Sequence, residues 1–169
     1  MSEYDSRAAT LAHIHAVRDR IGVFITEMLH RARTHDASKL SPEEKPVFDQ
    51  VFPLLRGVSY GSAEWNEAVQ RAAPALVHHY RRNSHHPEHY AEGVAGMDLF
   101  DVVEMLCDWM ASAERNPGDG VRLDLNVRTF GIEPQLAAIL ANTLARWPNA
   151  KVQQSGESES PRSRQGRRG

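Results

Sequence analysis

Residues 7–33, RAATLAHIHAVRDRIGVFITEMLHRAR, decide the fold class of this chain. Their apolar side chains recur at steps of three and four residues, the spacing that places side chains on one face of an α-helix. The sequence therefore predicts a long amphipathic helix that turns this face toward the core. The residues on the face are Ile14, Val17, Ile21, Phe24, Ile25 and Met28.

The rest of the chain is also predicted to be helical. Ser41 and Pro42 are suited to the N-cap and the first position of a second helix. No segment alternates polar and apolar residues as a strand does, and the length of 169 residues fits one domain. We expect an all-α protein with a single compact helical domain over residues 1–150. Its further helices are predicted at residues 41–55, 62–83, 97–115 and 133–147, with a loop at 116–120.

Residues 151–169, KVQQSGESESPRSRQGRRG, contain one apolar side chain, so they cannot bury enough surface to offset the entropy of ordering. They are predicted to form a disordered basic tail. Residues 1–150 carry 15 basic and 20 acidic side chains. This balance argues against a protein that binds nucleic acid through bulk positive charge, beyond a weak contact made by the tail.

The chain has one cysteine, Cys107, which excludes an intrachain disulfide and a cysteine-rich zinc site. We expect it to be a buried thiol in a reducing cytoplasm. No window approaches 18 uninterrupted apolar residues, and the first five residues carry two acidic side chains and no basic one. The sequence therefore predicts a cytoplasmic protein with neither a membrane span nor a secretory signal.

Histidine is the residue type that stands out, with nine in all and five of them between His78 and His89. His35 and Asp36 are adjacent and follow the first predicted helix. On a helical wheel of about 100° per residue, His13 falls within the apolar sector of that helix, so we expect it to point inward. A lone inward histidine is more often a hydrogen-bonded core residue, and it becomes a candidate ligand only where other ligands converge on it.

A second group of candidates follows the predicted helix 62–83. His79 and Asn83 lie one turn apart on its core side, which makes them neighbours. His85 and His86 come just before Pro87, which disfavours helical geometry in the residue that precedes it. This imidazole-rich segment has two interpretations, a solvated turn or part of a binding site.

Three carboxylates share one side of the predicted helix 97–115, at Asp101, Glu104 and Asp108. The simpler interpretation is the solvent-facing side of an amphipathic helix. The helix is apolar almost all round, however, which indicates that this stripe is buried too. Buried carboxylates need a cation, and a metal ion is one way to supply it.

Together these residues resemble the HD-domain superfamily of metal-dependent phosphohydrolases. That family holds a divalent metal with a first histidine, an adjacent His-Asp pair and a distant aspartate, which here match His13, His35, Asp36 and Asp108. HDASK is also similar to the HDxGK motif of the HD-GYP phosphodiesterases, whose lysine approaches phosphate and matches Lys39. Ser38 replaces the glycine of that motif, and no GYP sequence is present, so a cyclic dinucleotide substrate is not supported.

A closer resemblance covers residues 10–147. HDASK, HHYRRNSHHPEHY and EMLCDW are together similar to an uncharacterised family of small bacterial and phage proteins that are HD-like. It is this resemblance that identifies Asp108 as the last ligand. It supplies no substrate.

The resemblance implies a metal-dependent phosphohydrolase that acts on a nucleotide or another small phosphate ester through a metal-activated water. One or two ions of Mn, Fe, Co, Mg or Zn suit the nitrogen and oxygen donors. Two alternatives stay open, a non-catalytic metal-containing module that interacts with a partner or senses nucleotides, and a di-iron HD-type oxygenase. Catalytic roles are assigned to Lys39, His79 and His86, and a second metal or the phosphate to His79, Arg82, Asn83, His85 and His86.

Overall fold

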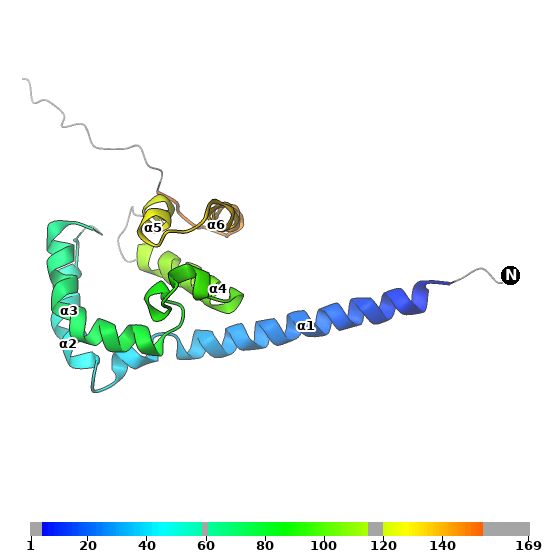
Figure 1. The fold of residues 1–169 in the computed structure, drawn as a ribbon, viewed down its shortest axis with the longest axis horizontal. Coiled ribbons are helices and arrows are strands. Elements are labelled where there is room, and N and C mark those ends of the chain that lie inside the picture. The colour runs from blue at the N-terminus through cyan, green and yellow to red at the C-terminus, as the bar shows by residue number, and fades with distance from the viewer. Residues whose placement is uncertain (1–4, 59–60, 115–119, 154–169) are drawn as a thin grey trace, which may run out of the picture. The chain divides into compact units, whose positions relative to one another are not determined.

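The computed structural model describes residues 5–58, 61–114 and 120–153 and confirms the all-α fold class (Figure 1). These residues form α-helices, short 3-10 helices and turns. The one bridge of strand type among them joins Val121 and Val152. None of the helices in the described ranges has the length and apolar character needed to cross a membrane.

The chain divides into two compact units, Met1–Trp109 and Met110–Gly169, where the sequence predicts one domain. The first unit contains α1 (Arg7–Thr34), α2 (Lys45–Val51), α3 (Ala63–Arg82) and most of α4 (Leu99–Ala113). The second contains the end of α4, then α5 (Leu123–Thr129) and α6 (Pro134–Arg146). All of the candidate ligands lie in the first unit.

Helix α1 has the predicted bounds to within a residue, but the prediction that its apolar face is buried is wrong. Ile14 is 52% exposed and Ile21 is 54% exposed. The contacts that join α1 to the rest of the first unit come from its C-terminal half. There Phe24 is half-buried and stacks on Phe100, with ring centroids 4.6 Å apart. At 1.5 Å per residue the helix is about 42 Å long, so its N-terminal half extends beyond these contacts.

The predicted start of the second helix is also wrong. Helix α2 begins at Lys45, with Pro46 rather than Pro42 in its first turn. Residues 41–44 form a turn in which the Ser41 carbonyl accepts from the amides of Glu44 and Lys45. This turn carries the Glu44 side chain into the interior, where it is fully buried.

Helix α3 follows the prediction closely. The Ser62 side chain caps its start by accepting a hydrogen bond from the Trp65 amide, and Asn83 follows its last residue. The buried face of α3 carries the small residues Ala68, Ala72 and Ala75, which pack with the buried Phe48 and Val51 of α2 in one apolar cluster. This packing fixes the end of α3 beside the turn that carries Glu44.

Helix α4 is the most apolar of the helices, as predicted, and Met105 and Leu106 are buried. In the second unit α6 confirms the predicted last helix, whereas α5 was not predicted. Residues 151–153 belong to that unit rather than to a tail, because Val121 exchanges backbone hydrogen bonds with Lys151 and Gln153. Residues 116–119 of the predicted loop and 154–169 of the predicted tail lie outside the described residues.

Replacing Phe48 by Ala is expected to lower the free energy of unfolding of the first unit by about 3–5 kcal/mol, because it leaves a cavity between α2 and α3. Urea denaturation of the metal-free protein measures this. Phe52→Ala is the matched control, since Phe52 is 43% exposed and stacks on the same ring. Equal losses in the two variants would show that the α2 and α3 cluster is not the core of the unit.

Candidate metal centre

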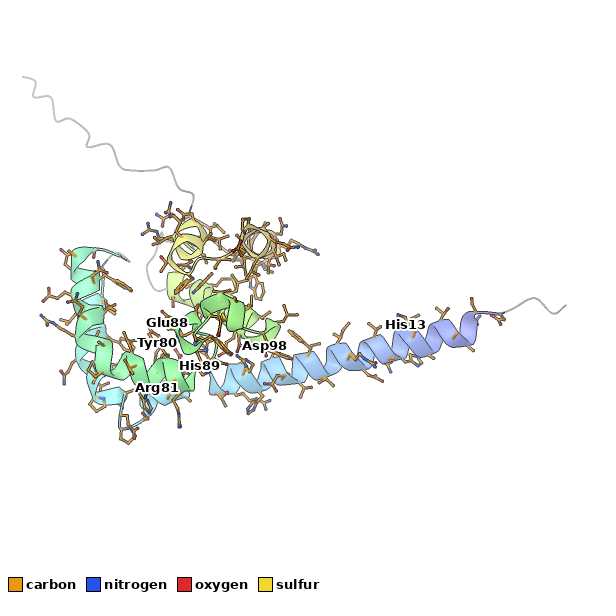
Figure 2. The ribbon with its side chains drawn as sticks, viewed as in Figure 1. His13, Tyr80, Arg81, Glu88, His89 and Asp98 are labelled. Carbon is orange, nitrogen blue, oxygen red and sulfur yellow. The ribbon has the colours of Figure 1, made fainter. Side chains whose placement is uncertain are left out.

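Four segments of the first unit bring imidazoles and carboxylates together. His35 ends α1 and Asp36 follows it, His79 lies in the last turn of α3, and His85 and His86 come from the loop after α3. Helix α4 adds Glu104 and Asp108. In Figure 2 the labelled Tyr80, Arg81, Glu88, His89 and Asp98 mark the end of α3 and the loop that leads to α4.

Asp36 lies at the centre of this cluster and has an unusual backbone. Its φ of 56° and ψ of 12° are left-handed, a conformation that few residues other than glycine adopt and that aspartate tolerates better than most. The kink ends α1 and turns the carboxylate inward. One of its oxygens, Oδ2, accepts a hydrogen bond from Lys39 Nζ three residues later. Its other oxygen faces histidines.

The first candidate group consists of Asp36, His79, His85 and His86. Asp36 Oδ1 lies 3.1 Å from His79 Nε2 and 3.5 Å from His85 Nε2. His79 Nε2 lies 3.0 Å from His86 Nε2. His79 and His85 are almost completely buried. Four donor atoms therefore converge from α3, its following loop and the end of α1.

A second candidate group, His35, Asp36 and Asp108, shares Asp36 with the first. His35 Nε2 lies 3.5 Å from Asp36 Oδ2 and 3.7 Å from Asp108 Oδ1. The two oxygens of Asp36 thus face different groups. One carboxylate can bridge two ions in this arrangement.

The structure brings Glu104 into the cluster, a residue that the sequence analysis did not assign to the site. With His35 and His85 it forms a third group that could hold an ion, through the Nδ1 atoms of both rings, besides the two groups centred on Asp36. Glu104 Oε1 lies 2.8 Å from His35 Nδ1 and 3.0 Å from His85 Nδ1, and its Oε2 accepts from Arg31 Nε at 2.7 Å. Arg31 also binds Asp101, with 2.5 Å between Nη2 and Oδ1. Two of the three carboxylates of the α4 stripe, Asp101 and Glu104, are therefore buried, Asp108 is half-buried, and Arg31 neutralises part of the stripe.

Glu44 contacts imidazoles on the α3 side of the cluster, as Glu104 does on the α4 side. Its Oε2 lies 2.9 Å from His79 Nδ1 and accepts from Ser38 Oγ at 3.1 Å, while its Oε1 lies 2.7 Å from His78 Nδ1. Asn83 is near this network too, where its amide donates to Ser38 Oγ and to the His79 carbonyl, each at 2.8 Å. Its amide nitrogen also lies 3.1 Å from His79 Nδ1, so Asn83 contacts a candidate ligand directly although it belongs to none of the candidate groups.

The charges of the cluster shift the titration of its members. The Asp108 and Glu104 carboxylates raise the pKa of His35 to about 10. Burial, together with His85 and His79, lowers the pKa of His86 to about 3, so this imidazole is neutral at pH 7. Burial acts to raise the pKa of Asp36, but His79 and the Lys39 ammonium outweigh it and hold that pKa well below its ordinary range.

Two buried atoms at the centre show that the residues fit a cation. Asp36 Oδ1 and His85 Nε2 make no hydrogen bond of good geometry among the described residues, although both are shielded from solvent; the 3.1 Å contact of His79 Nε2 with Asp36 Oδ1 is an ion-pair contact. Leaving a buried polar atom unpaired is costly. Ligands of one ion at bond lengths near 2.1 Å lie roughly 3 to 4.2 Å apart, and each candidate group keeps its donor atoms within 4.8 Å of one another. A divalent ion would satisfy both unpaired atoms at once.

His13 is a correction to the sequence-based ligand set. His13 is exposed, and it belongs to none of the candidate groups found among the described residues. The reason is the length of α1, which separates His13 from His35 by 22 positions, or about 33 Å along the axis. Figure 2 shows His13 toward the opposite end of α1 from the cluster.

The other predicted site residues divide clearly. His35, Asp36, His79, His85, His86 and Asp108 all lie in the candidate groups, and Lys39 pairs with one of them. Arg82 is exposed on α3 and joins neither group. The sequence could have predicted Glu104 as a site residue, since it lies four residues before Asp108 on the same side of a helix. It could not have predicted Glu44, because residues 41–44 read as a helix start.

With this geometry in hand, comparison with known proteins adds one finding. The family described as "Family of unknown function (DUF5662)" matches residues 2–146. The chain belongs to this family. Neither the curated proteins nor the solved structures contain a match to it. The function of this DUF5662 member is therefore inferred from the geometry of its site.

The stability of the metal-free protein is expected to peak near pH 6.5. His86 titrates at about 3 when folded and near 6.5 when unfolded, so its contribution falls as the pH drops below 6.5. His35 has the opposite shift, so its contribution is complete below 6.5 and is lost as the pH rises toward about 10. Each limb has a slope of up to about 1.4 kcal/mol per pH unit.

Urea denaturation of chelator-treated protein between pH 5 and pH 9 measures this profile. His86→Asn should flatten the acidic limb, whereas His13→Asn, at an exposed position on α1, should leave it unchanged. A wild-type profile without slope between pH 5 and pH 6.5 would contradict the burial of a neutral His86.

Proposed function

We propose that this protein is a metal-dependent phosphohydrolase that acts on a small phosphate ester, of which a nucleotide is the favoured class. The observation that carries the metal centre is the pair of unpaired buried atoms, Asp36 Oδ1 and His85 Nε2, in a cluster of imidazoles. The reaction class rests on Lys39 beside the centre and on the resemblance of HDASK to phosphohydrolase motifs.

The two groups centred on Asp36 are expected to bind ions in sequence. Asp36, His79, His85 and His86 form the stronger group, because they include three imidazoles and both unpaired atoms. The group of His35, Asp36 and Asp108 is weaker before metal binds, since the Lys39 ammonium already neutralises Asp36 Oδ2. His35 must also lose a proton before its Nε2 can bind an ion, because the pKa of His35 is raised.

The donor set favours Mn, Fe, Co or Zn over Mg. Imidazoles suit the transition metals, whereas Mg²⁺ prefers carboxylates and water in an octahedral arrangement. Cys107 is in neither group among the described residues, and burial raises the pKa of its thiol. A thiolate ligand is therefore not part of the proposal.

The proposed reaction transfers a phosphoryl group to water. A new bond forms between water oxygen and phosphorus, the bond from phosphorus to the ester oxygen breaks, and a proton ends on the departing oxygen. A bound divalent ion supplies an activated water and polarises the phosphoryl oxygens. Lys39, whose side chain is 23% exposed, is in position to neutralise charge on the phosphate.

We infer that His79 and His86 bind metal rather than transfer protons. His79 is 1% exposed, and the lowered pKa of His86 makes it a poor proton donor at neutral pH. The site also departs from the HD pattern at its first histidine, because His13 is remote from it. In this proposal the histidines of the first group, His79, His85 and His86, take the place of that ligand.

The same donors would suit two irons, so an oxygenase is the second candidate, favoured by the number of imidazoles. Elemental analysis separates the candidates. Two irons per chain with oxygen-dependent turnover would identify the oxygenase, and nucleotide binding without turnover would identify a sensing module.

Protein purified without chelator is expected to contain one or two equivalents of Mn, Fe, Co or Zn. Asp36→Ala should abolish retention of the proposed ions, because the two groups centred on Asp36 lose their shared carboxylate. His85→Ala should lose the first ion. Elemental analysis of folded, tag-free protein is the measurement, with circular dichroism as the check on folding.

His13→Ala is the matched control for these variants. It should keep the full metal content, since His13 lies in an exposed part of α1. Loss of metal in His13→Ala would restore the HD ligand pattern and overturn the ligand set proposed from the structure.

Removing the ammonium in Lys39→Ala is expected to lower phosphate-ester hydrolysis by about 10²- to 10³-fold while the metal content stays unchanged or rises. The rise is expected because Asp36 Oδ2 loses its competing partner. Turnover of a panel of nucleotides and sugar phosphates measures the loss. Lys45→Ala is the control, at an exposed lysine paired with Asp49. Equal rates in the two variants would remove Lys39 from the reaction.

A further inference from the structure

Two buried carboxylates outside the two groups centred on Asp36 contact the far side of the imidazoles of those groups. Glu44, fully buried, has its Oε2 2.9 Å from His79 Nδ1. Glu104, 9% exposed, has its Oε1 2.8 Å from His35 Nδ1 and 3.0 Å from His85 Nδ1. In each of these three histidines the other ring nitrogen, Nε2, faces Asp36.

The carboxylates determine which ring nitrogen carries the proton. Glu44 accepts a hydrogen bond from Ser38 Oγ and Glu104 accepts one from Arg31 Nε, so both carboxylates act as acceptors. An ionised carboxylate can only accept a hydrogen bond, so each contacting Nδ1 carries the hydrogen. An imidazole that binds an ion is neutral, and with the hydrogen on Nδ1 its lone pair lies on Nε2, the atom that faces Asp36.

Each carboxylate is itself held in place by groups that are not metal ligands. Ser38 Oγ donates to Glu44 Oε2 at 3.1 Å, and His78 Nδ1 lies 2.7 Å from its Oε1. Arg31 Nε donates to Glu104 Oε2 at 2.7 Å. These contacts leave Glu44 and Glu104 little freedom to turn toward the ions, and they fix the orientation of the rings that they contact.

We propose that Glu44 and Glu104 are positioning residues that control the two ion sites unequally. Glu44 acts through His79 and therefore on the first group alone. Glu104 acts through His85 on the first group and through His35 on the second. This inference rests on the proposed metal centre, but it requires neither the phosphohydrolase activity nor a particular metal.

The test is a titration of the metal-free full-length chain with Zn²⁺ in competition with a chromogenic chelator, at pH 7, for wild type and variants. Glu44→Gln should weaken the first ion about 10- to 100-fold and leave the second ion unchanged. Glu104→Gln should weaken both ions by similar factors. The isosteric amide keeps the volume of each side chain, so the change is in charge and hydrogen bonding.

Two controls separate positioning from general loss of structure. Asp101→Asn removes another buried carboxylate of the first unit, one that binds Ser84, Tyr90 and Arg31 but forms no hydrogen bond with a ligating imidazole among the described residues. It should weaken the first ion less than Glu104→Gln does. His78→Ala removes a partner of Glu44 that is not a ligand, and it should weaken the first ion less than Glu44→Gln does.

Nuclear magnetic resonance of the histidine rings supplies a readout that a merely structural role would not move. In Zn²⁺-loaded wild type, His79 and His85 should each carry the proton on Nδ1. Glu44→Gln should shift the Nδ1 proton resonance of His79 and not that of His85, whereas Glu104→Gln should do the reverse. Should Glu44→Gln fail to fold, Glu104→Gln tests the same pairing through His85 and His35.

The outcomes are distinct. Wild-type protein that binds no Zn²⁺ overturns the metal centre and this inference with it. Wild-type protein that binds Zn²⁺, with Glu44→Gln and Glu104→Gln as tight as Asp101→Asn, overturns the positioning roles alone. Equal weakening of both ions by Glu44→Gln overturns the unequal control.

Discussion

The interaction on which the rest of the site depends is the inward turn of the Asp36 carboxylate. A left-handed residue two positions after the end of the 28-residue α1 places this carboxylate among histidines from α3 and its following loop. Because its two oxygens face different partners, Lys39 and His35 on one side and His79 and His85 on the other, the cluster becomes one connected network. The strained backbone is stabilised by the contacts that it makes possible.

Around this carboxylate the chain concentrates more ionisable groups than a structural role requires. Arg31 neutralises Asp101 and part of Glu104, and Glu44 is bonded by Ser38 and two imidazoles. At the centre, Asp36 Oδ1 and His85 Nε2 do not have hydrogen bonds of this kind. A cluster whose outer carboxylates are hydrogen-bonded while polar atoms at its centre are not is typical of a cation-binding site.

Sequence patterns predicted the helices well because helical periodicity and caps are local properties. They placed His35, Asp36, His79 and Asp108 among the candidate ligands, which needs only adjacency, helix phase and a resemblance. They failed for His13 because a helical wheel gives the direction of a side chain around the axis and not its distance along it. They failed for Glu44 because the turn at residues 41–44 depends on α2 packing against α3, a contact between segments that periodicity does not report.

The ligands come from parts of the chain that are far apart in sequence, and this has a consequence for folding. His35 and Asp108 are separated by 73 positions, so an ion bound between them closes a long loop. Such a cross-link restricts the unfolded chain, and its benefit is available only where the ion binds the folded state more tightly than the unfolded one. The resistance of the first unit to unfolding then rises with the logarithm of the free ion concentration. The ion would serve as a removable tether that joins α1, the α3 loop and α4 within the unit.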